Sequence, residues 1–492
     1  MGALNILLLI SIIPLFGIVL LLLTPEKYES YCNNLALLIS SLTFFLSLVL
    51  WLEFDSNCGF FQFFRTFDWL PLFNFYYSIG VDGISLFFIV LTTFLIMICI
   101  LIGWNSITYR IKDYLICFLL LEFLLIQVFS VLDLLLFYIF FEGVLMPMFL
   151  IVGVWGSRER KIRAAYQFFL YTLVGSLLML VGILVIYFQT GTTDLQVLQN
   201  VEFSEKKQII LWLSFFFSFA VKVPMIPFHI WLPEAHAEAP TTGSVMLAGI
   251  LLKLGAYGFL RFSIPMFPIA TVFFIPFIFT LSLIAAIYAS LTTLRQVDLK
   301  KIIAYSSVSH MGFVTVGLFT LNIQGLEGSI FLMLSHGLVS SALFLCVGIL
   351  YDRHRTRIIK YYSGLAQVMP VFSIFFLFFS FANIGFPGTS SFVGELLILL
   401  GAFQLSVILT VLISFSMVLS AAYSIWMFNR IMFGTLKLQY INTFQDLSRR
   451  EFAVLFSITL LILWMGVYPE SFLQEIHISA FNLLEQTNYS QK

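Results

Sequence analysis

The chain has 492 residues, of which 61% are hydrophobic and only 10% are charged, and its formal net charge is zero. Soluble domains carry about 25% charged residues, so this composition excludes a water-soluble globular fold and indicates a polytopic membrane protein. The zero net charge argues against a nucleic-acid partner, and the five cysteines lack the spacing of a disulfide framework, a zinc site or an iron–sulfur cluster.

Apolar segments of about 20 residues, the length that crosses a bilayer, follow one another along the whole chain. We predict an all-α polytopic membrane protein with about 14 transmembrane helices, near residues 4–23, 33–52, 80–103, 114–131, 133–154, 165–188, 209–231, 242–261, 267–291, 302–320, 327–350, 370–400, 404–428 and 452–468. The first segment is interpreted as a span rather than a cleaved signal. The polar connections between the spans are too short to form a domain outside the membrane.

Positive charges are distributed unevenly over the loops between these spans. Eighteen Lys and Arg residues fall in loops on one side and five in loops on the other. The side richer in Lys and Arg is expected to face the cytoplasm, or the matrix in a mitochondrion. Because the number of spans is even, both termini are expected on the opposite side, which in a mitochondrion is the intermembrane space.

Two further cations lie inside predicted spans: Lys222 in "FAVKVP" and Lys253 in "GILLKLGAYG". A cation at the centre of a bilayer costs about 2.5–3.5 kcal/mol on insertion, so each marks an ion path or a ligand site unless it forms a structural salt bridge between helices. Other titratable residues also lie within predicted spans: Glu122, Glu142, His310, His336 and Glu395. A single salt bridge needs only two such groups, so the set favours an ion or proton pathway.

Helix-breaking residues interrupt the seventh and twelfth spans at four positions: Pro224, Pro227, Pro387 and Gly388. The first two follow Lys222, and the other two precede Glu395. Proline removes a backbone donor and clashes with the preceding turn, so a helix kinks or unwinds there. Unwound backbone at membrane depth is tolerated only where protein or water satisfies it.

The broken helix is the fourth of five spans in each half, which predicts an internal duplication; chance placement of common proline kinks is the alternative. An odd number of spans per copy makes the second copy inverted, and inverted repeats with interrupted helices are typical of transporters. We therefore predict four regions: an N-terminal three-helix region at 1–112, a first five-helix repeat at 113–264, a second, inverted repeat at 265–433, and a C-terminal helix and tail at 434–492.

Three long stretches resemble a known family: "FYIFFEGVLMPMFLIVGVWGSRERKIRAAYQFFLYTLVGS", "PFHIWLPEAHAEAPTTGSVMLAGILLKLGAYG" and "DLKKIIAYSSVSHMGF". They are similar to the antiporter-like membrane-arm chains of respiratory complex I, NADH–ubiquinone oxidoreductase, whose superfamily includes multisubunit sodium/proton antiporters. The similarity covers nearly the whole chain. The tract after "PFHIWLP" and the lack of a long lateral helix favour the chain 4 family over chains 2 and 5.

The resemblance implies roles for the buried charges. Glu142 corresponds to the glutamate that pairs with the broken-helix lysine, Lys222. Lys253 corresponds to the central lysine and Glu395 to the terminal glutamate. His310 and His336 correspond to polar linkers along a hydrated axis, and we add Glu122 and His229 as secondary candidates.

Elementary electrostatics supplies a mechanism for such a set. Burial disfavours the charged form of a lysine, and a nearby carboxylate favours it. Lys222 is therefore expected to hold its proton while a charged Glu142 is close and to release it when Glu142 is withdrawn or neutralised. We predict that Lys253 is the middle relay and that Glu395 leads the exit.

Other chemistry is not predicted. Four polar residues follow the seventh span, but the prolines among them scatter the side chains and argue against a metal site: His229, Glu234, His236 and Glu238. An axial haem role for His310 and His336 lacks a second matching pair of histidines. The chain has no phosphate-binding loop and no dinucleotide motif. NADH, FMN, iron–sulfur clusters and ubiquinone are therefore expected to be bound by partner subunits.

Taken with the resemblance, these observations predict a proton-translocating subunit of complex I in the mitochondrial inner membrane, driven by quinone reduction in other subunits. The expected partners are other membrane-arm subunits, with chains 2 and 5 as neighbours, and membrane lipids. A stand-alone or multisubunit cation/proton antiporter is the alternative. A non-transporting scaffold is disfavoured by the buried lysines.

Overall fold

The structure is a computed structural model that describes residues 3–25, 27–437, 439–440 and 445–489. The chain divides into two compact units. Unit 1 comprises Met1–Val223, Lys253–Ile275 and Gln474–Lys492, and unit 2 comprises Pro224–Leu252 and Pro276–Leu473.

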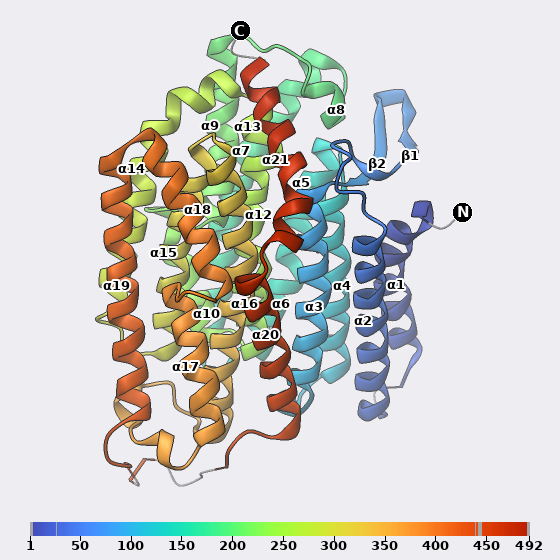
Figure 1. Ribbon diagram of the computed structural model, residues 1–492. Helices are drawn as coiled ribbons and strands as arrows, with labels where there is room; N and C mark the ends of the chain where they lie inside the picture. The colour runs from blue at the N-terminus through green and yellow to red at the C-terminus, as the bar shows by residue number, and fades with distance from the viewer. Residues whose placement is uncertain (1–2, 26, 438, 441–444, 490–492) are drawn as a thin grey trace. The chain divides into compact units, whose positions relative to one another are not determined.

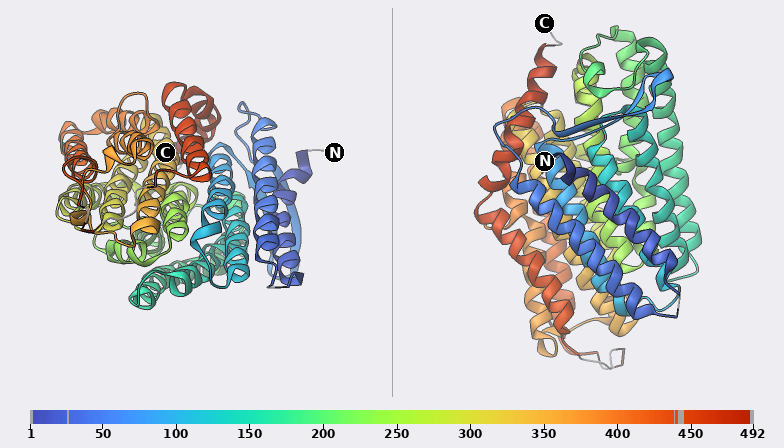
Figure 2. Two further views of the ribbon diagram at one scale, coloured as in Figure 1. Left: turned by 90° about the horizontal axis from the view of Figure 1, so that it is seen from below. Right: turned by 90° about the vertical axis from the view of Figure 1, so that its right-hand side faces the viewer.

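Unit 1 begins with four helices that pack on one another: α1 (Ala3–Leu23), α2 (Glu29–Leu52), α3 (Gly83–Ser106) and α4 (Ile111–Ser130). Figure 2 shows α1 and α2 side by side. A capping box starts α3, because the Asp82 side chain accepts from the Ser85 backbone N–H while the Ser85 hydroxyl accepts from the Asp82 N–H. Most side chains of α3 are buried, which makes this helix the core of the four.

Five further helices complete the N-terminal part of unit 1: α5 (Leu134–Gly143), α6 (Leu145–Trp155), α7 (Lys161–Thr190), α8 (Leu195–Leu198) and α9 (Glu205–Lys222). The Asp133 carboxylate caps α5 by accepting from the backbone N–H groups of Leu135 and Leu136. Helix α7 packs along α9. It ends at Gly191, whose φ of +72° suits a residue without a Cβ.

A β-hairpin lies between α2 and α3, near the helix ends (Figure 1). Strand β1 (Gln62–Leu70) pairs antiparallel with β2 (Phe75–Val81), and the 3₁₀ turn η1 (Pro71–Phe73) joins them. The Leu132 N–H donates to the Ser78 carbonyl (2.9 Å), which ties β2 to the start of α5. This segment was predicted to be a polar connection, so both strands are a difference from the prediction.

One long helical stretch contains two turns of π-helix. Residues Thr241–Met266 form α11 (Thr241–Met246), the π-helical η3 (Leu247–Leu251), α12 (Leu252–Gly258), the π-helical η4 (Phe259–Ser263) and α13 (Ile264–Met266). Helix α14 (Pro268–Thr293) follows. π-helical turns are rare and occur frequently at functional sites.

Unit 2 is built around one central helix, α16 (Ile323–His354), most of whose side chains are buried. Helices of unit 2 that contact it include α11, α15 (Leu299–Phe319), α17 (Pro370–Ile384), α18 (Ser390–Leu405) and α20 (Arg449–Val467). The remaining elements are η2 (Phe228–Ile230), α10 (Trp231–Glu238), η5 (Ile359–Tyr361), η6 (Leu365–Gln367) and α19 (Val407–Met432).

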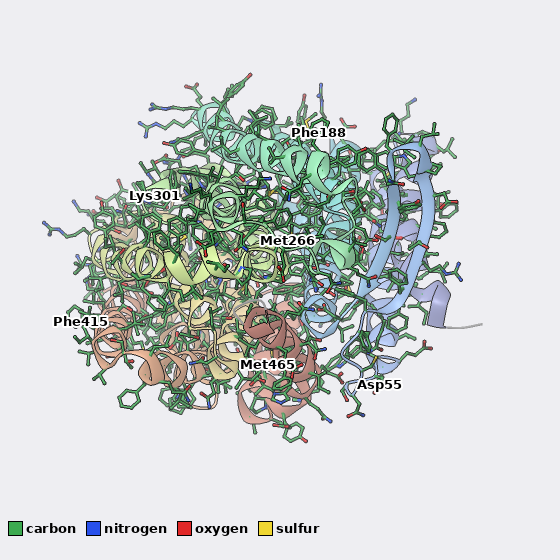
Figure 3. The ribbon with its side chains drawn as sticks, turned by 90° about the horizontal axis from the view of Figure 1, so that it is seen from above. Asp55, Phe188, Met266, Lys301, Phe415 and Met465 are labelled. Carbon is green, nitrogen blue, oxygen red and sulfur yellow. The ribbon has the colours of Figure 1, made fainter. Side chains whose placement is uncertain are left out.

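Within the described ranges, twelve helices are long and apolar enough to cross a membrane. The two other predicted spans are the broken ones, formed by α9 with η2 and α10, and by α17 with α18. Large apolar side chains project outward from membrane helices, as at Phe188 on α7 and at Phe415 on α19 (Figure 3). The helical membrane fold is confirmed, while the exact number of spans and the repeat boundaries at 112, 264 and 433 remain predictions.

Two features differ from the sequence analysis. The C-terminal tail contains a further helix, α21 (Glu470–Tyr489), which is anchored in unit 1 where Asn482 Nδ2 donates to the Gly59 carbonyl (2.9 Å). In addition, three cations counted as loop charges are buried: Arg261, Lys300 and Arg357. They interact with carboxylates or carbonyl oxygens inside the protein, so they carry no information about which side of the membrane the loops face.

Candidate functional site

Lys222 is buried at the last turn of α9 in unit 1. The negative end of the helix dipole favours a cation at this position. Its Nζ lies 4.4 Å from the ring centroid of Phe141 and 3.5 Å from the Phe141 carbonyl oxygen. A cation over an aromatic face is attracted by the ring quadrupole, so Phe141 helps to hold the charged form.

Glu142 follows Phe141 at the end of α5, and its carboxylate acts electrostatically on Lys222. The Ser176 side chain of α7 faces the same carboxylate. Oε1 of Glu142 has no hydrogen-bond partner in the described part of the chain. Three helices of unit 1 thus converge on one lysine–carboxylate couple that retains a site for a proton or a water molecule.

Lys253 is fully buried on α12, whose backbone packs tightly against the end of α9. A Cβ added at Gly255 would lie 2.7 Å from the Phe219 carbonyl oxygen and 3.0 Å from Lys222 Cβ. The lack of a side chain at Gly255 therefore sets the spacing between the two helices that carry the buried lysines.

Unit 2 holds a second buried cluster around Glu395 of α18. Nδ1 of His310, on α15, lies 3.4 Å from Glu395 Oε1, and the rings of His310 and His336 are 5.6 Å apart. Tyr423 of α19 lies close enough to act electrostatically on the carboxylate. Oε2 of Glu395 has no hydrogen-bond partner among the described residues.

The predicted helix breaks lie beside these clusters along the chain. α9 ends at Lys222, and Pro224 and Pro227 lie between it and η2. In unit 2, Pro387 and Gly388 lie between α17 and α18.

The second break contacts the buried carboxylate directly. Gly385 adopts a φ of +81°, and a Cβ there would lie 2.2 Å from Glu395 Oε2. Helix α20 covers the same turn, because a Cβ at Gly466 would lie 2.3 Å from the Gly388 carbonyl oxygen.

The secondary candidates lie apart from these contacts. Glu122 of α4 is fully buried and accepts from Thr43 Oγ1 of α2 at 2.5 Å, while its Oε2 has no hydrogen-bond partner among the described residues. His229, in η2, packs edge-on to the rings of Tyr288 and Tyr305, with centroids 6.1 and 6.3 Å away.

A buried ion pair between Asp82 and Arg261 in unit 1 was missed. The guanidinium makes two hydrogen bonds to the carboxylate, of 2.6 and 2.8 Å. Burial opposes the charged form of Asp82, but Arg261 and the Ser85 hydrogen bonds outweigh it and hold the pKa of this N-cap carboxyl below its usual value of 3.8. The signal was present, because Arg261 follows Lys253 within the same apolar stretch.

A second missed group surrounds Arg357 in the loop after α16. Its Nη2 lies 3.7 Å from Glu238 Oε1, and its Nε lies 3.5 Å from Asp298 Oδ2. The basic loop "RHRTRIIK" gives no sequence signal for a buried arginine. No group of three or more metal-ligating His, Cys, Asp or Glu side chains was found within the described ranges.

Each unit therefore contains a buried carboxylate faced by a lysine or histidine from another helix, and one member of each pair, Lys222 or Glu395, lies near a helix interruption along the chain. Ionisable groups inside membrane helices are costly, and arrangements of this kind mark ion and proton pathways. The fold and the two clusters define an ion-translocating membrane protein of the antiporter-like class.

Comparisons with known proteins identify the family. Residues 131–420 match the family described as NADH:quinone oxidoreductase/Mrp antiporter, TM. The protein named NADH-ubiquinone oxidoreductase chain 4 from Chondrus crispus is 72% identical over 486 residues, which cover 99% of each chain. The chain therefore belongs to the NADH:quinone oxidoreductase/Mrp antiporter family and, within it, to the NADH-ubiquinone oxidoreductase chain 4 proteins.

Two solved structures are similar over almost the whole chain. A chain of respiratory complex I from Thermus thermophilus with bound NADH has a TM-score of 0.89 at 32% identity and covers 98% of this chain and 99% of that chain. A chain of the Mrp complex from Dietzia sp. has a TM-score of 0.88 at 18% identity and covers 100% of this chain and 99% of that chain. At such low identity the second match shows a shared fold alone. The predicted family and fold are confirmed, while the roles of individual residues remain predictions.

Proposed function

We propose that this chain is a proton-translocating membrane-arm subunit of respiratory NADH:ubiquinone oxidoreductase, complex I, and that its two buried clusters carry the protons. Membership of the chain 4 proteins supports the first part. The single observation that carries the second part is the position of Lys222, buried at the interrupted end of α9 and within the field of Glu142.

In unit 1, the proton is held on Nζ of Lys222. Three favourable interactions offset the burial of the ammonium: the α9 dipole, the Phe141 ring and carbonyl, and the charge of Glu142. A proton bound by Glu142 removes the last of these interactions and leaves a buried cation without a balancing anion, so Lys222 releases its own proton. Ser176 stabilises the charged carboxylate and opposes premature uptake.

In unit 2, the carboxyl of Glu395 exchanges a proton with His310, and His336 extends the path. The pair is neutral in total when Glu395 is charged and His310 is protonated, or when the proton lies on the carboxylate. The proton can therefore move between them without placing a net charge in the interior. Lys253 is the relay between the Lys222 step and the Glu395 step, and Glu395 leads the exit.

Family membership and the loop charges support the wider setting that we propose. Electron transfer takes place in partner subunits, which bind NADH, FMN, iron–sulfur clusters and ubiquinone. Chains 2 and 5 are the neighbours of this chain in the mitochondrial inner membrane. The basic loops face the matrix, both termini face the intermembrane space, and residues 113–264 and 265–433 are inverted repeats.

The test compares Glu142→Ala and Lys222→Ala in the assembled complex, reconstituted in sealed vesicles. The number of protons pumped per electron is expected to fall in both variants. The matched control is Lys207→Ala, at the exposed opposite end of α9, where Nζ donates to Gln189 Oε1 (3.0 Å). A wild-type ratio in both Glu142→Ala and Lys222→Ala contradicts the assignment.

A stand-alone cation/proton antiporter is distinguished by purification. If the purified chain alone exchanges sodium for protons, the antiporter is supported. If it co-migrates with NADH oxidase activity in a large assembly, the complex I subunit is supported.

A further inference from the structure

A group of charges in unit 2 takes no part in the mechanism above. It lies where α10 ends, where α15 begins and where the loop after α16 passes. Arg357 is fully buried and lies between two carboxylates, Glu238 at 3.7 Å and Asp298 at 3.5 Å. The Asp298 side chain is 17% exposed and the Glu238 side chain is 4% exposed. Arg357 therefore connects a partly accessible carboxylate with a buried one.

Backbone hydrogen bonds fix the arginine in this position. The Leu299 N–H donates to the Arg357 carbonyl (2.9 Å), and the Ile359 N–H donates to the Val297 carbonyl (3.0 Å). Lys300 anchors the end of α10, because its Nζ donates to the Ala239 carbonyl at 2.7 Å. The loop, α15 and α10 are thus held together around one guanidinium.

Glu238 is not locked into this group. Its distance to Arg357 exceeds the 2.7–2.9 Å or so of a charge-assisted hydrogen bond. Its Oε2 is buried and has no hydrogen-bond partner in the part of the chain that the structure describes. Because Arg357 also faces Asp298, a proton on Glu238 does not leave the guanidinium without an anion.

We propose that Glu238 is a proton-binding carboxylate that takes up protons from the aqueous side bordering these loops; this rests on the proposed function. A hydronium ion that reaches the group through the Asp298 side transfers its proton to Oε2, an O–H bond forms there, and water remains. No electron is transferred. The bound proton is then available to the interior of unit 2.

The charged surroundings of Glu238 come from several elements. Lys300, on α15, interacts electrostatically with Glu238. It also interacts with three other charged groups of this region: Arg357, Asp298 and Asp352. Asp352, near the end of α16, interacts with three further charged groups. Arg353 lies on the same helix, Arg355 in the loop that follows it, and Glu451 on α20. On α10 itself, Glu234 forms an ion pair of 2.6 Å with Lys301, which is labelled in Figure 3.

That neighbouring pair supplies the matched control. Glu234 and Glu238 lie one turn apart on α10, and each faces a cation. The Glu234 side chain is 38% exposed and the Lys301 side chain 28%, so this pair is in contact with water and is not expected to bind a proton for transport.

The experiment measures protons pumped per electron in vesicles that contain the assembled complex, across a range of external pH. Glu238→Gln is expected to lower the ratio, and the deficit is expected to grow as the pH rises, because a collecting carboxylate matters most when free protons are scarce. Glu238→Asp keeps a carboxylate and is expected to pump, with the pH profile displaced. Glu234→Gln is expected to match the wild type throughout.

Two results overturn the inference. One is a wild-type ratio at every pH in Glu238→Gln, or, if that variant fails to assemble, an unchanged pH profile in Glu238→Asp. The other is a loss of pumping in Glu238→Gln that is equal at every pH and is not restored in Glu238→Asp. That result would show that Glu238 has only a structural role. The Glu142 and Lys222 variants, measured in the same vesicles, decide the proposed function separately.

Discussion

His310 and Glu395 face each other from two helices of unit 2, with Nδ1 of the imidazole 3.4 Å from Oε1 of the carboxylate. Both side chains are buried, and the second imidazole, His336, lies 5.6 Å from the first, ring to ring. A carboxylate buried at this depth needs a partner that carries a proton when the carboxylate does not. The separation allows that partner to exchange the proton rather than hold it permanently.

Replacement of His310 by Phe is expected to abolish most of the pumping that depends on Glu395. The buried carboxylate then lacks a cation to balance its charge, so it stays protonated and no longer cycles. The measurement is the proton-to-electron ratio of the assembled complex. His477→Asn, at an exposed position on α21, is the control and is expected to pump normally. Equal ratios in the two variants would remove His310 from the path.

Gly385→Ala is expected to damage both stability and pumping. The φ of +81° is unfavourable for alanine by about 1–2 kcal/mol, and the new Cβ would lie 2.2 Å from Glu395 Oε2. Gly388→Ala is the matched control, because its φ is +89° but a Cβ there has no neighbour within 4 Å. Thermal stability should fall in both variants, and the pumping ratio only in Gly385→Ala. Identical pumping in both would show that the carboxylate tolerates displacement.

Gly255→Ala is expected to separate α12 from α9 and to lower pumping. Its Cβ would meet the Phe219 carbonyl oxygen at 2.7 Å, a backbone atom that cannot turn away. The control is Gly153→Ala on α6, whose Cβ would lie 3.7 Å from Ala165 Cβ in ordinary contact. That control is expected to gain about 0.5–1 kcal/mol from the change in helix propensity. A Gly255→Ala complex that pumps normally would show that the spacing of the two lysine helices is not critical.

Breaking the buried Asp82–Arg261 pair by Arg261→Ala is expected to destabilise unit 1 by about 3–5 kcal/mol, because an uncompensated carboxylate is left inside. The double variant Asp82→Asn with Arg261→Met should recover part of the loss. Thermal unfolding of the solubilised complex provides the measurement. If the single and double variants are equally stable, the charge is not the cause.

The Asp82–Arg261 pair also predicts the direction in which stability changes with pH. The pKa of Asp82 lies below its usual value of 3.8 in the folded protein, so its stabilising contribution is complete above that value. It is lost as the pH falls below 3.8 through the folded-state pKa. The difference in stability between the wild type and the double variant is therefore expected to be constant at neutral pH and to shrink only in strong acid.

The buried lysines and carboxylates could be predicted from the sequence, because a charged residue within a long apolar segment is recognisable whatever that segment packs against. Apart from the Glu142–Lys222 pair, which the family resemblance implied, the sequence did not reveal their partners. That His310 faces Glu395, or that Gly385 lies over that carboxylate, depends on contacts between segments that the sequence does not show. Arg357 was misread because a basic loop gives the same pattern whether it is exposed or buried. The hairpin was missed because most side chains of β1 are at least partly exposed and show no clear alternation of burial.

The two π-helical turns in Thr241–Met266 make the direction of Lys253 a matter of residue count. A π turn holds roughly one residue more than an α turn, and each residue of an α-helix advances the chain by about 100° around its axis. Converting η3 to regular helix with the same number of residues would rotate the following side chains by about that angle. Lys253 would then point elsewhere, although no residue beside it had changed. Deleting one residue from Leu247–Leu251 together with the π turn would instead leave the direction of Lys253 unchanged, so the wide turn upstream compensates for one extra residue in the chain.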